Sequence, residues 1–400
     1  MAGPKWASLI FTKKITAVKN YYNLFLIMTL LACKSNIDSD KSKSDKEDLK
    51  SAVQYKMVSL DTVYLEAPNS TFVGYLFLTN RDINFIDRIQ SKVFQFDHQG
   101  NFKQEFLGRG DGPDRQNGIF GIVSEGDELI VLSDNHISIF DTSFKLKDRL
   151  NFTLGGQESV EEMLHAPRSD MFGLYEISWI SQEVNMPIFP LAEGQGFILP
   201  VMMTHPELNG YWTTEYYESV AIFGLFDEKY NLQKLGGKRS EEYLKYNYLP
   251  NFDYSYFTTK GDSLLVSFPI DPKIHVYDLE FNFLGTFGEP GIAMKMDYIP
   301  TQTLEEAESQ WGTDRVQFGH YDDIFYDAKE GLLFRSYLPR GNGAKSARLQ
   351  VYKGIQLAAD LEVPIRFRVL GSVDGVFYAD GIVDEENEKL AFFKFKLDEK

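Results

Sequence analysis

Residues 93–107 read VFQFDHQGNFKQEFL, which is a β-rich run ending in Asp97, a short turn, and a run in which polar and apolar residues alternate. The β-rich run with its terminal acid recurs along the chain. The copies lie at 93–97, 137–141, 222–227 and 274–278, with a degenerate copy at 349–353. Short alternating runs separated by turn residues are typical of β-hairpins.

The spacing of these copies predicts the size of the repeating unit. Asp97, Asp141, Asp227 and Asp278 are 44, 86 and 51 residues apart, and 86 is about two of the shorter spacings. A unit of about 45 residues with several short strands is typical of one four-stranded propeller blade. Six such units can be assigned, at 70–107, 118–154, 186–236, 253–288, 320–363 and 366–398. We therefore predict an all-β fold, a six-bladed β-propeller over residues 53–400, with an aromatic-rich insertion at 208–218.

The two ends of the predicted ring complement each other. The sixth unit offers only three strands, at 366–370, 375–379 and 390–397, whereas residues 55–66 form a spare strand. An open edge strand exposes unpaired backbone groups, so closing the ring is favoured. We expect 55–66 to be the outer strand of the last blade. Helix is expected mainly at 300–311, capped by Thr301 or Thr303, with one turn at 240–245.

Cys33 is the only cysteine and follows Leu-Leu-Ala at 30–32. An apolar stretch at 24–32 precedes it, and the residues before that stretch carry lysines and no acid, the order typical of a secretory signal. The apolar stretch is too short to cross a bilayer. Leu-Leu-Ala-Cys resembles the lipobox of bacterial lipoproteins, which implies a diacylglycerol on Cys33 and cleavage after Ala32. The alternative is an ordinary signal peptide with a chance or buried cysteine.

Residues 34–50 separate this signal from the first strand and are almost entirely polar. Such a segment cannot bury enough apolar surface to fold, so it is interpreted as a tether. The predicted domains are therefore a signal peptide at 1–32, a tether at 33–52 and the propeller at 53–400. The expected location is the cell envelope, with a lipid anchor. Lys34, directly after Cys33, favours the outer over the inner membrane.

The chain is acidic, with 58 Asp and Glu against 41 Lys and Arg and a net charge of −17. An acidic surface repels phosphate backbones, so no nucleic-acid partner is expected. It also gives no attraction to anionic lipid, so acyl chains would have to hold the protein at a membrane. Aromatic residues make up 14% of the chain, which favours strands over helices.

Three motifs add a resemblance to a known group. They are the turn GRGDGPD at 108–114, the segment HYDDIFYD at 320–327, and the pair Phe334-Arg335. With the six-unit spacing and the lipobox, the chain resembles the TolB-like six-bladed β-propeller lipoproteins of Gram-negative bacteria. Within them it is most similar to a family known only as a domain of unknown function. The resemblance covers most of 53–400 and implies the fold, but it specifies hardly anything about activity.

The same motifs supply candidate ligand-binding residues. In the turn at 108–114, Arg109 could bind an anion, and Asp111 and Asp114 a cation, at a mouth of the channel. The alternative is an inter-blade turn in which glycines supply positive φ and aspartates cap the backbone. Two more candidates come from the later motifs, His320 and Arg335.

Trp212 is a further candidate, because it lies in the aromatic run at 211–217. Such a run could stack on a sugar or a peptide. The alternative is a packed lid over the third blade.

No catalytic or metal-binding motif occurs in the sequence. The six histidines form no H-x-x-x-H or H-E-x-x-H pair, and there is no G-x-S-x-G, P-loop or dinucleotide motif, so neither a cofactor nor a metal is predicted. The first hypothesis is a binding or scaffolding module for a peptide, a glycan or an envelope protein. The alternative is a hydrolase or lyase with carboxylate, Arg and His residues at the channel mouth. Converging residues of those types would favour the enzyme, and a shallow aromatic surface would favour binding.

Overall fold

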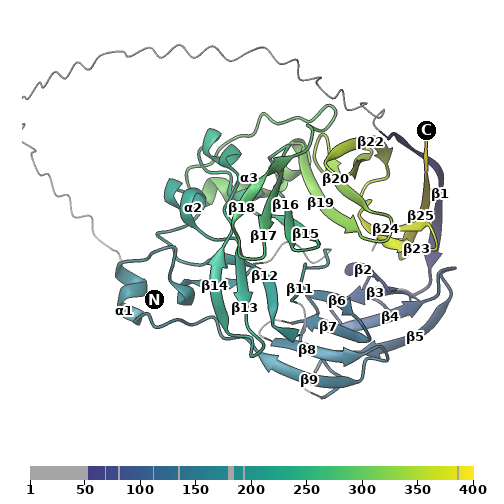
Figure 1. The fold of residues 1–400 in the computed structure, drawn as a ribbon, viewed down its shortest axis with the longest axis horizontal. Helices are drawn as coiled ribbons and strands as arrows, with labels where there is room; N and C mark the ends of the chain where they lie inside the picture. The colour runs from purple at the N-terminus through teal and green to yellow at the C-terminus, as the bar shows by residue number, and fades with distance from the viewer. Residues whose placement is uncertain are drawn as a thin grey trace, which may run out of the picture. The chain divides into compact units, whose positions relative to one another are not determined.

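The structure is a computed structural model that describes residues 53–400 except 68, 80–81, 111, 134–135, 179–183, 192–193 and 385–386. Six antiparallel sheets are arranged around a common centre (Figure 1). The predicted six-bladed β-propeller is therefore confirmed. Cys33, the expected signal peptide at 1–32 and the expected tether at 33–52 lie outside the described residues.

Each blade is built from strands that follow one another in the sequence, except that the last blade also takes the first strand of the chain. The strands of the first three blades are β2 Gly74–Leu78, β3 Ile83–Asp87, β4 Lys92–Phe96 and β5 Phe102–Leu107; β6 Gly121–Glu125, β7 Glu128–Leu132, β8 His136–Asp141 and β9 Leu146–Asn151; and β10 Tyr175–Ile177, β11 Phe189–Pro190, β12 Phe197–Met203, β13 Phe223–Phe226 and β14 Leu232–Gly236. Those of the last three are β15 Tyr256–Lys260, β16 Ser263–Ser267, β17 Ile274–Asp278 and β18 Phe283–Phe287; β19 His320–Asp327, β20 Leu332–Leu338, β21 Ala347–Lys353 and β22 Gln356–Val363; and β23 Val369–Val373, β24 Val376–Asp384, β25 Lys389–Glu399 and β1 Tyr55–Leu65.

The ring closes through β1 as predicted. β1 pairs antiparallel with β25, from Tyr55 opposite Glu399 to Leu65 opposite Leu390, with a bulge between Met57 and Ser59. Both end residues of β1 are buried. The pairing joins the two ends of the described chain and covers the edge that β25 would otherwise expose.

The third blade differs from the prediction, because its inner position is divided between two short strands. β10 pairs with one end of β12, Tyr175 lying opposite Met203, and β11 pairs with the other end, Phe189 lying opposite Ile198. The predicted unit began at residue 186 and missed β10. Strands of two or three residues are too short to show a period in the sequence.

The repeated acid closes the hairpin between the third and fourth strands of a blade. Asp278 Oδ1 accepts from the backbone N–H groups of Glu280 (3.0 Å) and Asn282 (2.8 Å), and Asn282 Nδ2 donates to Asp278 Oδ2. Equivalent backbone bonds form at the other three copies, Asp97, Asp141 and Asp227. Side-chain hydrogen bonds within the turns, such as that from Asn101 to Asp97, act with these backbone bonds to lower the pKa of all four carboxyl groups. The repeat is therefore a turn signal.

The helices lie in connections between strands. α3 Leu304–Gln317 begins after its cap Thr303 and runs six residues beyond the predicted 300–311, and the predicted turn at 240–245 is the 3₁₀ helix η3 Glu241–Lys245. Among the described residues, the short helical segments that were not predicted are α1 Val160–His165, η1 Phe172–Leu174, α2 Thr214–Ser219 and η4 Pro250–Phe252. Within the described part of the chain, no helix is long and apolar enough to cross a bilayer.

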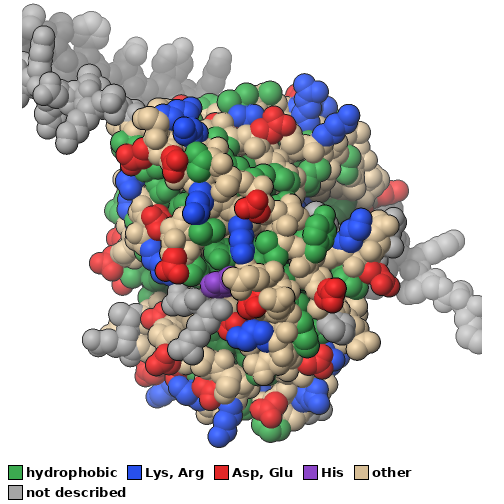
Figure 2. Space-filling view, turned by 90° about the vertical axis from the view of Figure 1, so that its right-hand side faces the viewer, with side chains coloured by type: hydrophobic (Ala, Val, Ile, Leu, Met, Phe, Trp, Pro, Cys, Tyr) green, Lys and Arg blue, Asp and Glu red, His purple; other side chains and the backbone are tan. Residues whose placement is uncertain are grey.

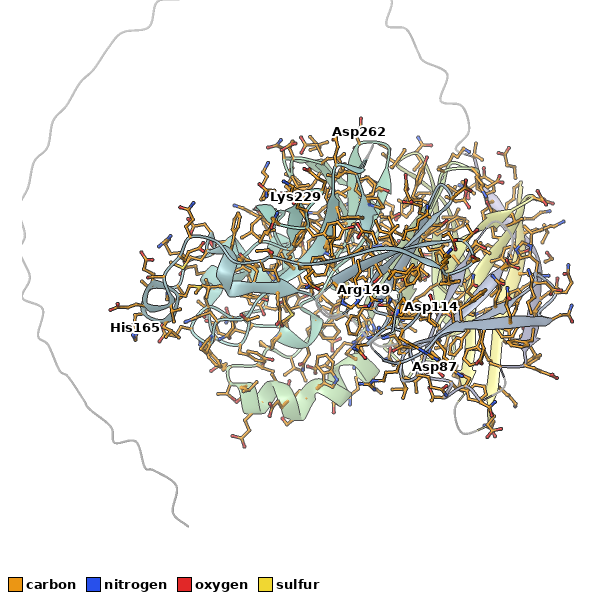
Figure 3. All side chains as sticks on the ribbon, turned by 90° about the horizontal axis from the view of Figure 1, so that it is seen from below. Asp87, Asp114, Arg149, His165, Lys229 and Asp262 are labelled. Atoms are coloured by element: carbon orange, nitrogen blue, oxygen red, sulfur yellow. The ribbon has the colours of Figure 1, made fainter. Side chains whose placement is uncertain are left out.

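The two faces of the ring carry different connections. α3 lies on the face opposite Asp262, which is in the β15–β16 turn, and Asp87 lies on the same side as α3 (Figure 3). On one edge of the ring, basic and acidic side chains are interspersed (Figure 2). The excess acid of the chain is therefore not gathered on that edge.

Candidate functional site in the central channel

A cavity of about 480 Å³ lies at the centre of the ring. Its wall includes the inner strand of every blade, since β2, β6, β11, β15, β19 and β23 all contribute residues. Small-molecule sites in proteins usually measure about 300–1,000 Å³. The cavity is therefore large enough for a small ligand or a few residues of a peptide.

Most of the cavity wall is apolar. It includes aromatic and aliphatic side chains, such as Phe77, Leu78, Val123, Ile188, Phe189, Phe257, Phe325, Tyr326 and Leu370. Among the described lining residues, the charged ones are Glu125, Asp323, Asp380 and Arg368. The wall therefore carries more acidic than basic groups.

A β-bulge gives the neighbouring residues Asp322 and Asp323 different surroundings. The register of β19 against β20 shifts between Tyr321 and Asp323. The side chains of Asp322 and Asp323 therefore have different neighbours. Asp322 Oδ2 lies 2.8 Å from Arg368 Nη2, whereas Asp323 lines the cavity. Bulges commonly redirect a side chain near functional sites.

Arg368 is held between two acids. Its Nε lies 3.1 Å from Asp322 Oδ2, and its Nη1 lies 3.9 Å from Asp380 Oδ2, which Arg366 Nε approaches at 3.3 Å. Burial alone would lower the pKa of Arg368, but the neighbouring acids, led by Asp322, raise it. Arg368 is therefore a permanent cation with acids on two sides.

Asp323 differs from Asp322 in having no such pairing. Among the residues that the structure describes, no basic side chain lies within ion-pair distance of its carboxylate, although Arg368 is near enough to favour the charged form. Burial disfavours the charged form more strongly and raises the pKa of Asp323 to about 7. We refer to Tyr256, Asp322, Asp323, Arg368 and Asp380 as the Asp323 cluster.

Further polar groups without partners lie beside this cluster. Within the described residues, Tyr254 Oη, Tyr256 Oη, Arg315 Nε and His320 Nε2 are buried and have no hydrogen-bond partner. The Tyr254 and Tyr256 rings pack edge to face with 5.6 Å between their centres, and the Arg315 guanidinium lies 4.8 Å from the Tyr254 ring centre. Buried polar groups are normally paired, so these atoms suggest a polar ligand or bound water.

His320 is the predicted site residue that lies closest to this region. Its Nδ1 donates to the Phe318 carbonyl over 3.1 Å, which leaves Nε2 as an acceptor. Burial lowers the pKa of its imidazole to about 4, so the side chain is neutral at pH 7. His320 is not one of the residues that line the cavity.

Arg109 and Asp114 lie elsewhere, in the loop between β5 and β6, and both are exposed. Asp111 lies outside the described residues. Gly108 and Gly110 in this loop have positive φ, and the loop is anchored by the buried Gln116, whose Oε1 accepts from Ser133 Oγ over 2.9 Å. Asp114 lies on the side of the ring that carries Asp87 (Figure 3). A ligand-binding role for this loop stays a prediction.

Arg335 and Trp212 occupy two further places. Arg335 is fully buried, and it donates to Ser267 Oγ (2.8 Å), to the Pro272 carbonyl (2.8 Å) and to the Asp271 carbonyl (2.6 Å). These bonds join the fifth blade to the fourth. Trp212 is 44% exposed beside α2, whereas Tyr216 and Tyr217 of the same aromatic run are buried. The predicted site residues are therefore not brought together.

The cavity does bring together Tyr256, Asp323 and Arg368, and none of these three was predicted from the sequence. One signal in the sequence could have indicated Asp323 as a site residue. It is the pair of consecutive acids at 322–323 inside a strand that also holds Tyr321, Ile324 and Phe325. No group of three or more His, Cys, Asp or Glu that could hold a metal ion occurs among the residues described.

Known proteins share the fold of this chain but give no information about the chemistry of its cavity. No family model and no curated protein matches the sequence. A member of the DUF4221 family from Bacteroides vulgatus is 13% identical, with a TM-score of 0.61 over 87% of this chain and 99% of that chain. A protein from Bacteroides fragilis, named as exported, is 13% identical, with a TM-score of 0.50 over 86% and 95% of the two chains. This chain therefore shares its six-bladed propeller fold with these two Bacteroides proteins.

Proposed function

We propose that the protein is a binding protein whose central cavity takes a short segment of a peptide. The observation that carries this proposal is the cavity of about 480 Å³, with its apolar wall and its polar Asp323 cluster. Sites of this kind, apolar with a few convergent polar groups, are typical of ligand binding. A glycan fits the wall less well, because its hydroxyl groups would leave water without gaining partners there.

The proposal can be tested by filling the cavity with a larger side chain and measuring which peptides still bind. Thr259 lines the cavity, so Thr259→Trp fills part of it with an indole ring. Thr286→Trp is the matched control, because Thr286 is exposed on β18, the outer strand of the same blade. Each purified protein is used to select binders from a random heptapeptide phage library.

We expect the wild-type protein and Thr286→Trp to enrich the same peptides, and Thr259→Trp to enrich none of them. Enrichment of the same peptides by Thr259→Trp would contradict the proposal. So would a wild-type protein that selects no peptide but binds members of a glycan array.

A second candidate function, a hydrolase or lyase, has its own supporting observation. The pKa of Asp323, raised to about 7, suits a general acid or base, and His320 Nε2 is an unpartnered acceptor in the same region. We rank this candidate second because His320 does not line the cavity. Mass spectrometry of a selected peptide after incubation distinguishes the two: cleavage by the wild type but not by Asp323→Asn supports the enzyme, and an intact peptide supports binding.

We also propose that the mature chain is an exported lipoprotein anchored through Cys33, with the outer membrane favoured. The sequence around Cys33 supports this, and the Bacteroides fragilis protein of the same fold is named as exported. Cys33→Ala should release the protein into the soluble fraction and abolish labelling by radioactive palmitate, because the acyl chains supply the membrane affinity. A Cys33→Ala protein that stays with the membrane and carries label would contradict the anchor.

A further inference from the structure

We propose that the peptide bound in the central cavity carries a basic group, an ammonium or a guanidinium, that pairs with the Asp323 carboxylate. This inference rests on the proposed function and specifies the chemistry of its ligand. It follows from the position of Asp323, the charge balance around it, and a buried hydroxyl group in the same cavity wall.

The position of Asp323 makes its carboxylate available to a ligand. The residue is half-buried, and the bulge in β19 leaves it in the cavity wall. No basic side chain among the described residues lies within ion-pair distance of it. A charge removed from water is costly unless it is paired, so a cation brought by the ligand would be stabilising here.

The charge balance of the cavity favours a cation over an anion. Its charged lining residues are three acids, Glu125, Asp323 and Asp380, and one base, Arg368. Arg368 already lies 2.8 Å from Asp322 and 3.9 Å from Asp380. Its positive charge therefore acts on all three of these acids, Asp322 and Asp380 at the distances given and Asp323 from farther away, and an added anion would meet an excess of negative charge.

The buried hydroxyl group of Tyr256 is a second, independent observation. Tyr256 is 3% exposed and lines the cavity, and within the described residues its Oη has no hydrogen-bond partner. A hydroxyl oxygen can accept from an N–H of a lysine or arginine side chain. The aromatic rings of Phe325 and Tyr326, also in the wall, suit a cation that enters past them.

The pairing should depend on pH. The charged groups that act on Asp323 are Asp322 on the same strand, Arg368 before β23 and Asp380 on β24, and Tyr256 on β15 lines the same cavity. Tyr256 has a pKa well above 10 because of burial, so it stays neutral, and Arg368 stays charged. Burial holds the pKa of Asp323 at about 7, and a bound cation would favour its ionised form. Affinity should therefore rise between pH 6 and pH 8.

The experiment uses the peptide that the wild-type protein selects and a counterpart in which norleucine replaces its basic residue. Both are titrated calorimetrically into the wild type, Asp323→Asn and Thr259→Trp at pH 6 and pH 8. At pH 8 the wild type should bind the basic peptide at least about tenfold more tightly than the norleucine peptide, with a smaller ratio at pH 6. Asp323→Asn, which keeps the shape of the side chain, should bind both peptides equally.

The outcomes separate this inference from the proposed function. Two results would contradict the pairing of a basic group with Asp323. One is a set of selected peptides in which Lys and Arg are not enriched. The other is a tenfold ratio of the two peptide affinities that persists in Asp323→Asn. Binding that survives in Thr259→Trp would overturn the cavity itself. If Asp323→Asn fails to fold, the wild-type protein still tests the inference through the ratio of its affinities for the two peptides at pH 6 and pH 8. Only pairing of the basic residue with a group that titrates near pH 7 makes that ratio depend on pH.

Discussion

At the residue scale, Arg335 and Asp323 show two uses of a charged side chain. The guanidinium of Arg335 is bonded to the fourth blade and lies 3.3 Å from the centre of the Tyr321 ring, so its role in the described structure is to join blades. Asp323 lines the cavity without an ion-pair partner among the described residues. The first charge stabilises the fold, and the second is available for binding.

Arg335→Lys should lower the free energy of unfolding by about 2–4 kcal/mol, because lysine cannot replace three hydrogen bonds made by a planar guanidinium in the core. Arg109→Lys, in an exposed loop, is the matched control and should change it by less than about 0.5 kcal/mol. Urea unfolding measures both. Equal stabilities for the two variants would mean that Arg335 does not join the blades as described.

The lowered pKa of His320 implies that the stability of the protein depends on pH. Its folded-state pKa of about 4 lies below the ordinary value of 6.5, so between these values the unfolded chain binds more protons and stability falls as pH decreases. From pH 7 to pH 5, protonation of His320 in the unfolded chain should lower the free energy of unfolding by about 1–2 kcal/mol. In His320→Gln the free energy of unfolding should fall by that much less over the same pH range. Urea unfolding of both proteins at the two pH values is the check. The same decrease in both would contradict a buried neutral imidazole.

The candidate site was only partly predictable from single residues. His320 was singled out by its place in a motif, and it does lie beside the Asp323 cluster. Asp323 was not distinguished from Asp322, because a β-bulge decides which of two neighbouring acids enters the cavity, and a bulge leaves no signature in polarity.

At the element scale, strand period and turn chemistry predicted most of the blades. The repeated aspartates mark real hairpin turns, and the spare strand at 55–66 is β1. The short strand β10 and the helices α1 and α2 were missed, because three to six residues carry too little pattern. For α1, the capping box formed by Ser159 and Glu162 was a usable signal in the sequence.

Ring closure by β1 gives a prediction about truncation. Deleting residues 34–50 should leave the melting temperature nearly unchanged, because the described contacts of the ring begin after them. Deleting residues 34–66 should lower it by several degrees or more, because β25 loses the partner that it has from Tyr55 to Leu65. Calorimetry compares the two proteins. Equal melting temperatures would contradict closure by β1.

At the scale of the whole molecule, the ring assembles a cavity from residues that lie far apart in the sequence. Its wall runs from Tyr75 in the first blade to Asp380 in the last. The number of blades could be predicted from the spacing of the repeated turn and the count of strand units, but the chemistry of the cavity could not. Which inner-strand side chains face the axis depends on the register of six sheets, and one bulge alters it.

Whether this cavity binds a basic peptide can be seen in a crystal structure of the protein with its selected peptide. We expect peptide density inside the ring, with a basic nitrogen about 3 Å from the Asp323 carboxylate. A peptide seated on the exposed loop at 108–114, on Trp212 or on the outer strands, with water in the cavity, would contradict it.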